Sequence, residues 1–379
     1  MGTIFNLMFT KCLSLLGHKV KFDELKDGVE KILIIGFVMA ASSFLPMFYY
    51  WFSHTNDVQL ITENLCIAFT NFLSIVKIAT FLTQKTKIIK IIKTFKDFLK
   101  TEDEAELREL RRVNNIAHRI LQFYTMGGSC VGYSFFLLPL LKYQYLKISN
   151  GNATRELSMY MKFPFETSHS PIYEVISLYT AVCIYIVVLY VAASDGTFFT
   201  ITLNIASHFK ILGKSIQRQE FSNSAQGKCY IKYFVNRHNT LCNITEEFRR
   251  IYSSIIFTSF LIASLQICVI VYQFVRHITN PVYMAVYGIF FCVIMLQMLM
   301  YCSGGERIKN ETWNLRDSVY LCNWHLLPIE DQKSIAFILQ RTQRNITMRV
   351  GFYDVTLKNF MVIFKAAVSY VTLVQSLAE

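Results

Sequence analysis

Seven apolar stretches, each close to the length of helix that crosses a lipid bilayer, constrain the fold of this chain more than any other feature. The hydrocarbon core of a bilayer is about 30 Å thick and requires about 20 residues of α-helix. Because lipid offers the backbone no hydrogen-bond partners, such stretches are expected to be helical throughout. The sequence therefore predicts an all-α membrane protein with seven transmembrane helices, at residues 32–53, 60–82, 120–142, 172–203, 253–275, 282–303 and 355–377.

The composition agrees with a membrane protein. Of the 379 residues, 53% are hydrophobic and 17% are charged, whereas about 25% of the residues of a soluble domain are charged. The mean hydropathy is +0.35. The net charge of +12 does not indicate a nucleic-acid partner, because the basic residues lie between the apolar stretches and not on one soluble face. Membrane lipid is the expected surrounding.

The positions of lysine and arginine predict the orientation. With a cytoplasmic N-terminus, 30 of the 38 Lys and Arg lie in cytoplasmic segments, namely 1–31, 83–119, 204–252 and 304–354. Cytoplasmic loops carry an excess of positive charge, so we predict a cytoplasmic N-terminus and an extracellular C-terminus. Residues 1–31 resemble an amphipathic segment on the inner leaflet more than a cleaved signal peptide. Among the N-x-S/T sequons, only Asn152 falls in an extracellular loop, which makes it the expected glycosylation site.

Two local patterns predict how particular helices continue or begin. In residues 87–100, isoleucine and phenylalanine recur at helical spacing, which favours a cytoplasmic continuation of the second span that packs on its neighbours over a lipid-binding helix. Asn280-Pro281 predicts a turn followed by a helix start, with proline in the first turn.

Charged residues within the apolar stretches include Lys77, Asp195 and Lys365. A charge at the bilayer centre costs about 2.5–3.5 kcal/mol on insertion scales. Lys77, near the inner end of the second span, is expected to extend its amine to the membrane interface. Lys365 is expected to face an aqueous vestibule or a subunit boundary. Asp195 is expected to be structural and to pair near the cytoplasmic end of the fourth span.

Motifs of enzymes and metal sites are not found. The sequence contains no Walker loop, GxGxxG, GxSxG or HExxH. Its eight histidines are scattered, and its ten cysteines contain no CxxC pair, so the cysteines are expected to be reduced thiols. We therefore predict that the chain is not an enzyme and uses no cofactor and no metal.

Several motifs in the C-terminal part of the chain occur together in one known family. They are FLIASLQIC at 260–268, LMYCSGGE at 299–306, Tyr320, Asn323-Trp324, Leu327-Pro328, Lys333, Gln340-Arg341 and FKAAVSYVTL at 364–373. Asp195 and the HFK at 208–210 agree with the same pattern. With these motifs the chain resembles the insect odorant receptors. It departs from them at His325, where tyrosine is usual, and at Asn345, near a common proline.

The resemblance implies a function and an architecture. Members of this family form tetrameric, ligand-gated, nonselective cation channels in the plasma membrane of olfactory sensory neuron dendrites. Residues 1–303 would form the first six spans with an odorant pocket. Residues 304–379 would form a cytoplasmic anchor, which includes a short helix near 328–345, and the last helix, which lines the pore. The co-receptor subunit carries a long insertion between spans four and five. Here that connection, 204–252, is short, which indicates an odorant-binding subunit that assembles with co-receptor subunits.

The resemblance also implies a ligand pocket for a small volatile molecule, in the outer half of the membrane among spans two, three, four and six. Such a pocket is expected to be largely apolar and aromatic. The candidate residues at that depth are Phe69, Phe72, Leu73, Ser129, Gly132, Tyr133, Phe136, Tyr179, Cys183, Met284 and Tyr287. At least half of them are expected to line the cavity.

A second implied site is the pore. Ala366, Ser369, Leu373 and Leu377 recur at the spacing of one helical face. A ring of leucines can stop ions by excluding water, and Leu373 and Leu377 match the gate positions of the family. The alternative is that this face contacts lipid or a neighbouring helix.

Three other classes of membrane protein fit less well. Gustatory receptors share the cytoplasmic N-terminus but usually carry Thr-Tyr-x-x-x-x-x-Gln-Phe in the last helix. Here Ser369-Tyr370 is followed by Gln375-Ser376. A G-protein-coupled receptor would have an extracellular N-terminus. A transporter would show broken helices or inverted repeats.

Overall fold

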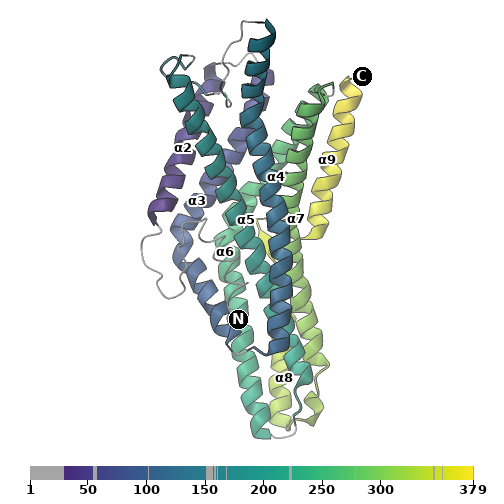
Figure 1. Cartoon of the computed structure of the whole chain (residues 1–379). Coiled ribbons are helices and arrows are strands. Elements are labelled where there is room, and N and C mark those ends of the chain that lie inside the picture. The colour runs from purple at the N-terminus through teal and green to yellow at the C-terminus, as the bar shows by residue number, and fades with distance from the viewer. Residues whose placement is uncertain are drawn as a thin grey trace.

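Long helices, each built around one of the apolar stretches, form a single bundle (Figure 1). The computed structural model describes residues 30–53, 58–100, 102–150, 157, 159, 161–167, 169–221, 224–277, 279–344, 346–351 and 353–378. The long helices are α2 (Glu30–Ser53), α3 (Val58–Leu99), α4 (Glu104–Asn150), α5 (Ile172–Arg218), α6 (Ser224–Arg276), α7 (Pro281–Tyr320) and α9 (Leu357–Ala378). The predicted amphipathic segment at the N-terminus and the predicted glycosylation site, Asn152, lie outside the described residues.

Six helices, α2 to α7, are long and apolar enough to cross a membrane, and α9 follows them as a further helix. The all-α prediction is confirmed, while the orientation stays a prediction. Helices α4 and α5 contain 47 residues each, or about 70 Å of helix at 1.5 Å per residue. Because a hydrocarbon core is about 30 Å thick, these helices continue well beyond the membrane.

Helix α5 lies at the centre of the bundle. It packs on α4 and α7 and also contacts α2, α3 and α6, and all of residues 190–209 are buried. Several of these residues carry hydroxyl groups. Thr197 and Ser207 donate theirs to carbonyl oxygens one turn earlier, at 2.7 and 2.8 Å. Because these hydroxyls are paired within the helix, neighbouring helices can approach α5 without supplying a partner.

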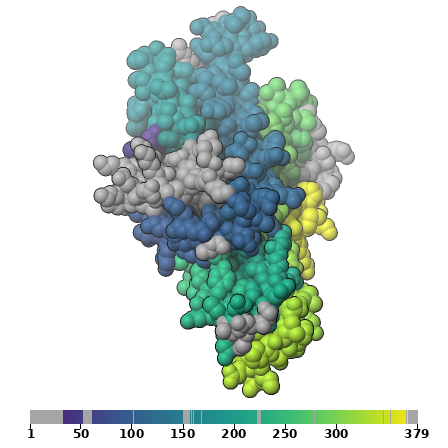
Figure 2. Space-filling model, turned by 60° about the horizontal axis from the view of Figure 1, so that its bottom comes forward, coloured from purple at the N-terminus to yellow at the C-terminus, as the bar shows by residue number. Residues whose placement is uncertain are grey.

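The ends of the helices that extend beyond the predicted spans pack together. Ile88, Ile91 and Phe95 are almost completely buried, which confirms that residues 87–100 continue α3 and contact its neighbours. A short helix, α8 (Ile329–Thr342), lies within the predicted range and is preceded by a 3-10 turn, η1 (Trp324–Leu326). Figure 1 places α8 at the lower end of α6 and α7, and Figure 2 shows this end from below, with the yellow-green residues of the α8 region beside teal residues.

Helix α7 is capped at its start and contacts the segment before α9 near its middle. At its start, the side chain of Asn280 accepts a hydrogen bond from the backbone N–H of Val282 at 3.2 Å, which confirms the predicted helix start at Asn280-Pro281. Further along, α7 contacts the segment that leads into α9. There, β1 (Arg349–Val350) and β2 (Tyr353–Asp354) form a two-stranded antiparallel hairpin. Its turn contains Gly351, whose φ of 58° favours glycine.

Candidate functional site

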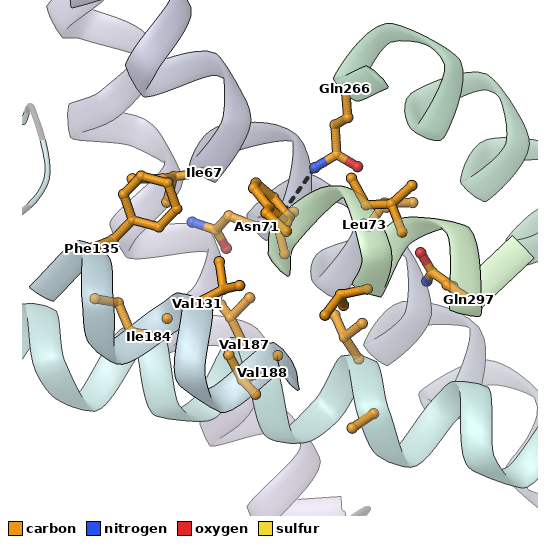
Figure 3. Close-up of a pocket in the computed structure, with 18 of the residues that line it drawn as sticks. Ile67, Asn71, Leu73, Val131, Phe135, Ile184, Val187, Val188, Gln266 and Gln297 are labelled. Atoms are coloured by element: carbon orange, nitrogen blue, oxygen red, sulfur yellow. Dashed lines mark hydrogen bonds between the residues drawn. The ribbon is translucent and has the colours of Figure 1, made fainter. Parts of the chain in front are cut away.

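A cavity lies between α3, α4, α5 and α7, with contributions from α2 and α6 (Figure 3). Its empty volume, including the open space at its mouth, is about 930 Å³. Because it includes this open space, the figure is an upper bound on the room that a bound molecule can fill.

The walls of the cavity are mostly aliphatic and aromatic. Side chains of this kind include Val131, Phe135, Ile184, Val187, Val188, Phe290 and Ile294. Two glycines on α4 also line it. A Cβ at Gly132 would lie 2.9 Å from a methyl carbon of Ile184, whereas one at Gly128 would lie 3.7 Å from Val188. Such walls offer dispersion contacts and few hydrogen bonds, which suits an apolar molecule.

A few amides interrupt this apolar surface. The Nε2 of Gln266 on α6 donates to the Thr70 hydroxyl at 2.9 Å and to the Cys66 carbonyl at 3.2 Å, both on α3. The Nδ2 of Asn71 on α3 donates to the Ser43 hydroxyl on α2 at 2.8 Å. These bonds fix α3 against α6 and α2 beside the cavity.

At one end of the cavity, two lining residues are hydrogen-bonded to a buried carboxylate. The Tyr124 hydroxyl and the Gln297 Nε2 donate to Oδ2 of Asp195 at 2.7 and 2.8 Å. The other carboxylate oxygen, Oδ1, accepts from Lys77 Nζ at 2.6 Å and from the Tyr301 hydroxyl. Asp195 thus joins α3, α4, α5 and α7 directly beside the cavity, and its predicted structural pairing is confirmed.

Lys77 does not reach the membrane interface, so that prediction is wrong. Its side chain is 1% exposed and forms an ion pair with Asp195, which is equally buried. The physical reason is that the Asp195 carboxylate pairs with the Lys77 ammonium inside the bundle. Three further donors from α4 and α7 complete the hydrogen bonds of that carboxylate. An intramembrane charge with such a partner needs no contact with water.

Five of the eleven predicted ligand-binding residues line one of two cavities. Leu73, Gly132 and Cys183 line the cavity described above. Ser129 and Tyr133 line a second cavity, between α4 and α5, whose empty volume is about 600 Å³. The remaining six, which lie outside both cavities, are Phe69, Phe72, Phe136, Tyr179, Met284 and Tyr287.

Two of these six have other partners within the bundle. The Tyr179 hydroxyl is 2.7 Å from the Ser42 hydroxyl, and one donates to the other. Tyr287 is buried, with its ring centroid 5.9 Å from that of Phe135. They shape the packing around the cavity without lining it.

Sequence reasoning missed the polar residues of the cavity. Asn71, Gln266 and Gln297 are amides within apolar spans, and polar side chains in such positions tend to face the interior of a bundle. That signal was available in the sequence. Which of the amides share one cavity depends on the packing of α3, α6 and α7.

Helix α9 packs on α6 and α7 by one face. Ala367 on that face is buried, whereas Ala366 and Ser369, two of the predicted pore residues, are exposed, as is Lys365. Leu373 and Leu377 belong to α9, but their side chains are not among those described.

The described residues thus form a multi-pass helical bundle with a largely apolar cavity that a few amide groups line. The family model described as 7tm Odorant receptor matches residues 57–368. The chain therefore belongs to the insect odorant receptor family, whose members are receptors and not enzymes. It is 32% identical to Odorant receptor 82a of Drosophila melanogaster over an alignment of 388 residues, which covers 100% of both chains. Odorant receptor 9a of the same species is 24% identical, over 88% of this chain and 85% of the relative.

Solved structures share the fold. The insect olfactory receptor OR5 from Machilis hrabei superposes with a TM-score of 0.72 at 17% identity, covering 98% of this chain and 97% of the other. The structure of that receptor in complex with eugenol superposes with a TM-score of 0.73 and covers 98% of both chains.

Proposed function

We propose that this chain is the odorant-binding subunit of a ligand-gated, nonselective cation channel, and that a small volatile molecule binds in the cavity between α3, α4, α5 and α7. The observation that carries the proposal is an apolar cavity beside the hydrogen-bonded carboxylate of Asp195. The eugenol complex of the Machilis hrabei receptor supports a small organic ligand. Leu73, Gly132 and Cys183 would contact it, and dispersion would supply most of the affinity.

The proposed ion path runs along α9. In the single chain, the face with Ala366 and Ser369 is not covered by α6 or α7. In a tetramer, this face would line a central pore, with Leu373 and Leu377 as the hydrophobic gate. The proposed partners are odorant co-receptor subunits, and the proposed location is the plasma membrane of sensory neuron dendrites, with a cytoplasmic N-terminus and an extracellular C-terminus.

Asp195 offers a route from the cavity to the pore helix. Two of its donors, Gln297 and Tyr301, are on α7, and the same helix contacts the segment before α9 at Gly305 and Val355. A ligand that shifts Gln297 would therefore shift α7 relative to α9. Such a ligand opens the channel only if it binds the open form more tightly than the closed form.

The first test is whole-cell current in cells that express this chain with and without an odorant co-receptor, against a broad panel of volatiles. We expect a ligand-evoked, nonselective cation current that requires both subunits and persists when G-proteins are blocked. A response carried only by G-protein signalling would refute the channel function, as would an extracellular N-terminus.

Truncation of the proposed gate is expected to raise the current without ligand. Leu373→Ala removes most of the side chain that excludes water from the closed pore. The current before and after ligand addition, divided by surface expression, measures this change. Met361→Ala, at an exposed position on another face of α9, is the control and should leave the basal current unchanged. Equal basal currents in the two variants would place Leu373 outside the gate.

Adding a methyl group to the cavity wall on α4 is expected to weaken the response to ligand more at Gly132 than at Gly128. Gly132→Ala forces Ile184 and Val188 to move, because its Cβ would lie 2.9 and 3.2 Å from their methyl carbons. We expect the half-maximal concentration of the larger active ligands to rise about tenfold, as for one methylene of misfit. Gly128→Ala, with its nearest atom at 3.7 Å, should have a smaller effect. Equal dose–response shifts in the two variants would argue that ligands bind elsewhere.

A further inference from the structure

One polar atom at the cavity lacks a hydrogen-bond partner. Among the described residues that line the cavity, Oδ1 of Asn71 is the one buried side-chain nitrogen or oxygen without a partner. Asn71 itself is 2% exposed. A buried acceptor left unpaired is costly, and bundles of this kind usually pair such groups within the protein. The free acceptor therefore suggests a ligand group that pairs with it.

The neighbouring residues fix which way the Asn71 amide points. The Ser43 hydroxyl donates its hydrogen to the Ala40 carbonyl at 2.9 Å. Its oxygen can then only accept, so it must face the NH2 group of Asn71, 2.8 Å away. The carbonyl oxygen of the amide is thereby left on the other side. Figure 3 shows this amide extending from α3 into the space among the labelled lining residues.

Other polar groups of the cavity wall are already engaged as donors. The hydroxyls of Thr70 and Thr125 donate to carbonyl oxygens of their own helices at 3.1 and 2.8 Å. The Nε2 of Gln297 donates to Asp195. A ligand donor approaching Asn71 Oδ1 displaces none of these bonds, so pairing there adds one hydrogen bond without breaking another.

We propose that Asn71 selects ligands with a hydroxyl group, small alcohols and phenols, over analogues of the same shape that can only accept. The ligand hydroxyl donates to Asn71 Oδ1, and its hydrocarbon part contacts apolar walls such as Val131 and Phe135. A methyl ether of the same molecule leaves Oδ1 unpaired and is disfavoured. A site built to bind a ligand hydroxyl rejects analogues that lack it, because its own polar group is then stranded. This inference rests on the proposed function of the cavity as the odorant site.

The test uses volatile alcohols and phenols, each paired with its own methyl ether, on cells that express the full chain with the co-receptor. We expect the hydroxyl member of each active pair to have a half-maximal concentration about three- to tenfold lower, the value of one hydrogen bond. In Asn71→Leu this preference should disappear through weaker responses to the alcohols. Thr125→Val, which removes a hydroxyl that is bonded to its own helix, should keep the preference.

A second variant tests the orientation of the amide without removing Asn71. In Ser43→Ala the NH2 group of Asn71 loses its acceptor, so the amide can turn and present either a donor or an acceptor to the ligand. We expect the preference for hydroxyl groups to fall, and responses to the ethers to improve. An unchanged preference in both Asn71→Leu and Ser43→Ala would overturn the role of Asn71.

Ligand binding without current separates this inference from the channel function. The same pairs are added to the purified full-length chain in lipid nanodiscs, where a bound ligand raises the melting temperature. Stabilisation by alcohols over ethers without any current would support the Asn71 inference and refute the channel function. Currents that do not differ between an alcohol and its methyl ether would support the channel function and refute the role of Asn71. If no alcohol or phenol gave either a current or stabilisation, both the channel function and the role of Asn71 would be overturned.

Discussion

Replacing Asp195 with leucine is expected to prevent most of the protein from reaching the cell surface. The change leaves the Lys77 ammonium, 1% exposed, without its counter-ion. It also removes the acceptor of the Tyr124, Gln297 and Tyr301 side chains. Breaking a buried ion pair by removing one partner costs about 3–5 kcal/mol, a large part of a typical unfolding free energy of about 5–15 kcal/mol.

Surface labelling and the melting temperature of the solubilised chain measure this effect. The double variant Lys77→Met with Asp195→Leu removes both charges, so it should recover part of the stability lost by Asp195→Leu alone. Glu246→Gln is the control, because its ion pair with Arg249, at 2.7 Å, lies on the surface, where such pairs contribute about 0–1 kcal/mol. A double variant no more stable than Asp195→Leu would show that the ion pair is not what holds this region.

Gly305→Ala is expected to separate α7 from the segment that leads into α9. A Cβ at Gly305 would overlap the carbonyl oxygen of Val355. Because that oxygen belongs to the backbone, no side-chain rotation relieves the overlap, and the hairpin or α9 must move. Overpacking of this kind typically costs about 1–3 kcal/mol and occasionally more. We expect a lower melting temperature, and in the tetramer an altered current without ligand, since the displaced helix is the proposed pore helix.

The matched control is Gly288→Ala on the same helix. There the nearest atom to the new Cβ, on Phe274, lies 3.9 Å away, an ordinary contact. Because alanine is a better helix former than glycine by about 0.5–1 kcal/mol, this variant should be as stable as the original chain or more stable. If Gly305→Ala and Gly288→Ala melted at the same temperature, the close approach of α7 to Val355 would not exist in solution.

The positions of the helices could be predicted because each helix satisfies its own backbone. An apolar stretch that enters lipid has to be helical, and the described helices contain each predicted span to within two residues. The start of α7 at Pro281 follows from an equally local signal, a turn at Asn280 followed by proline. The range of α8, in contrast, was implied by the family resemblance. How far α4 and α5 continue beyond the membrane is less visible, since their outer turns mix polar and apolar residues and are held by neighbouring helices.

The pairing of charges could not be predicted. Lys77 and Asp195 are 118 residues apart in the sequence, and each alone indicates only that an intramembrane charge needs a partner or water. Which of the two it finds depends on the packing of α3 against α5. The same holds for Asn71, Gln266 and Gln297, whose amides meet around one cavity because three helices from different parts of the chain face it.

The positions of the membrane helices follow from the apolar stretches alone, and the family follows from the motifs of the C-terminal part. The rotation of each helix about its axis depends on contacts that only the folded bundle makes. Phe72 and Leu73 are adjacent on α3, yet Phe72 is 39% exposed on the bundle surface, while Leu73 is 3% exposed and lines the cavity. In a soluble protein, polarity would distinguish the two faces of such a helix. In a membrane, the faces toward lipid and toward the cavity are both apolar, so only the contacts between helices can assign them.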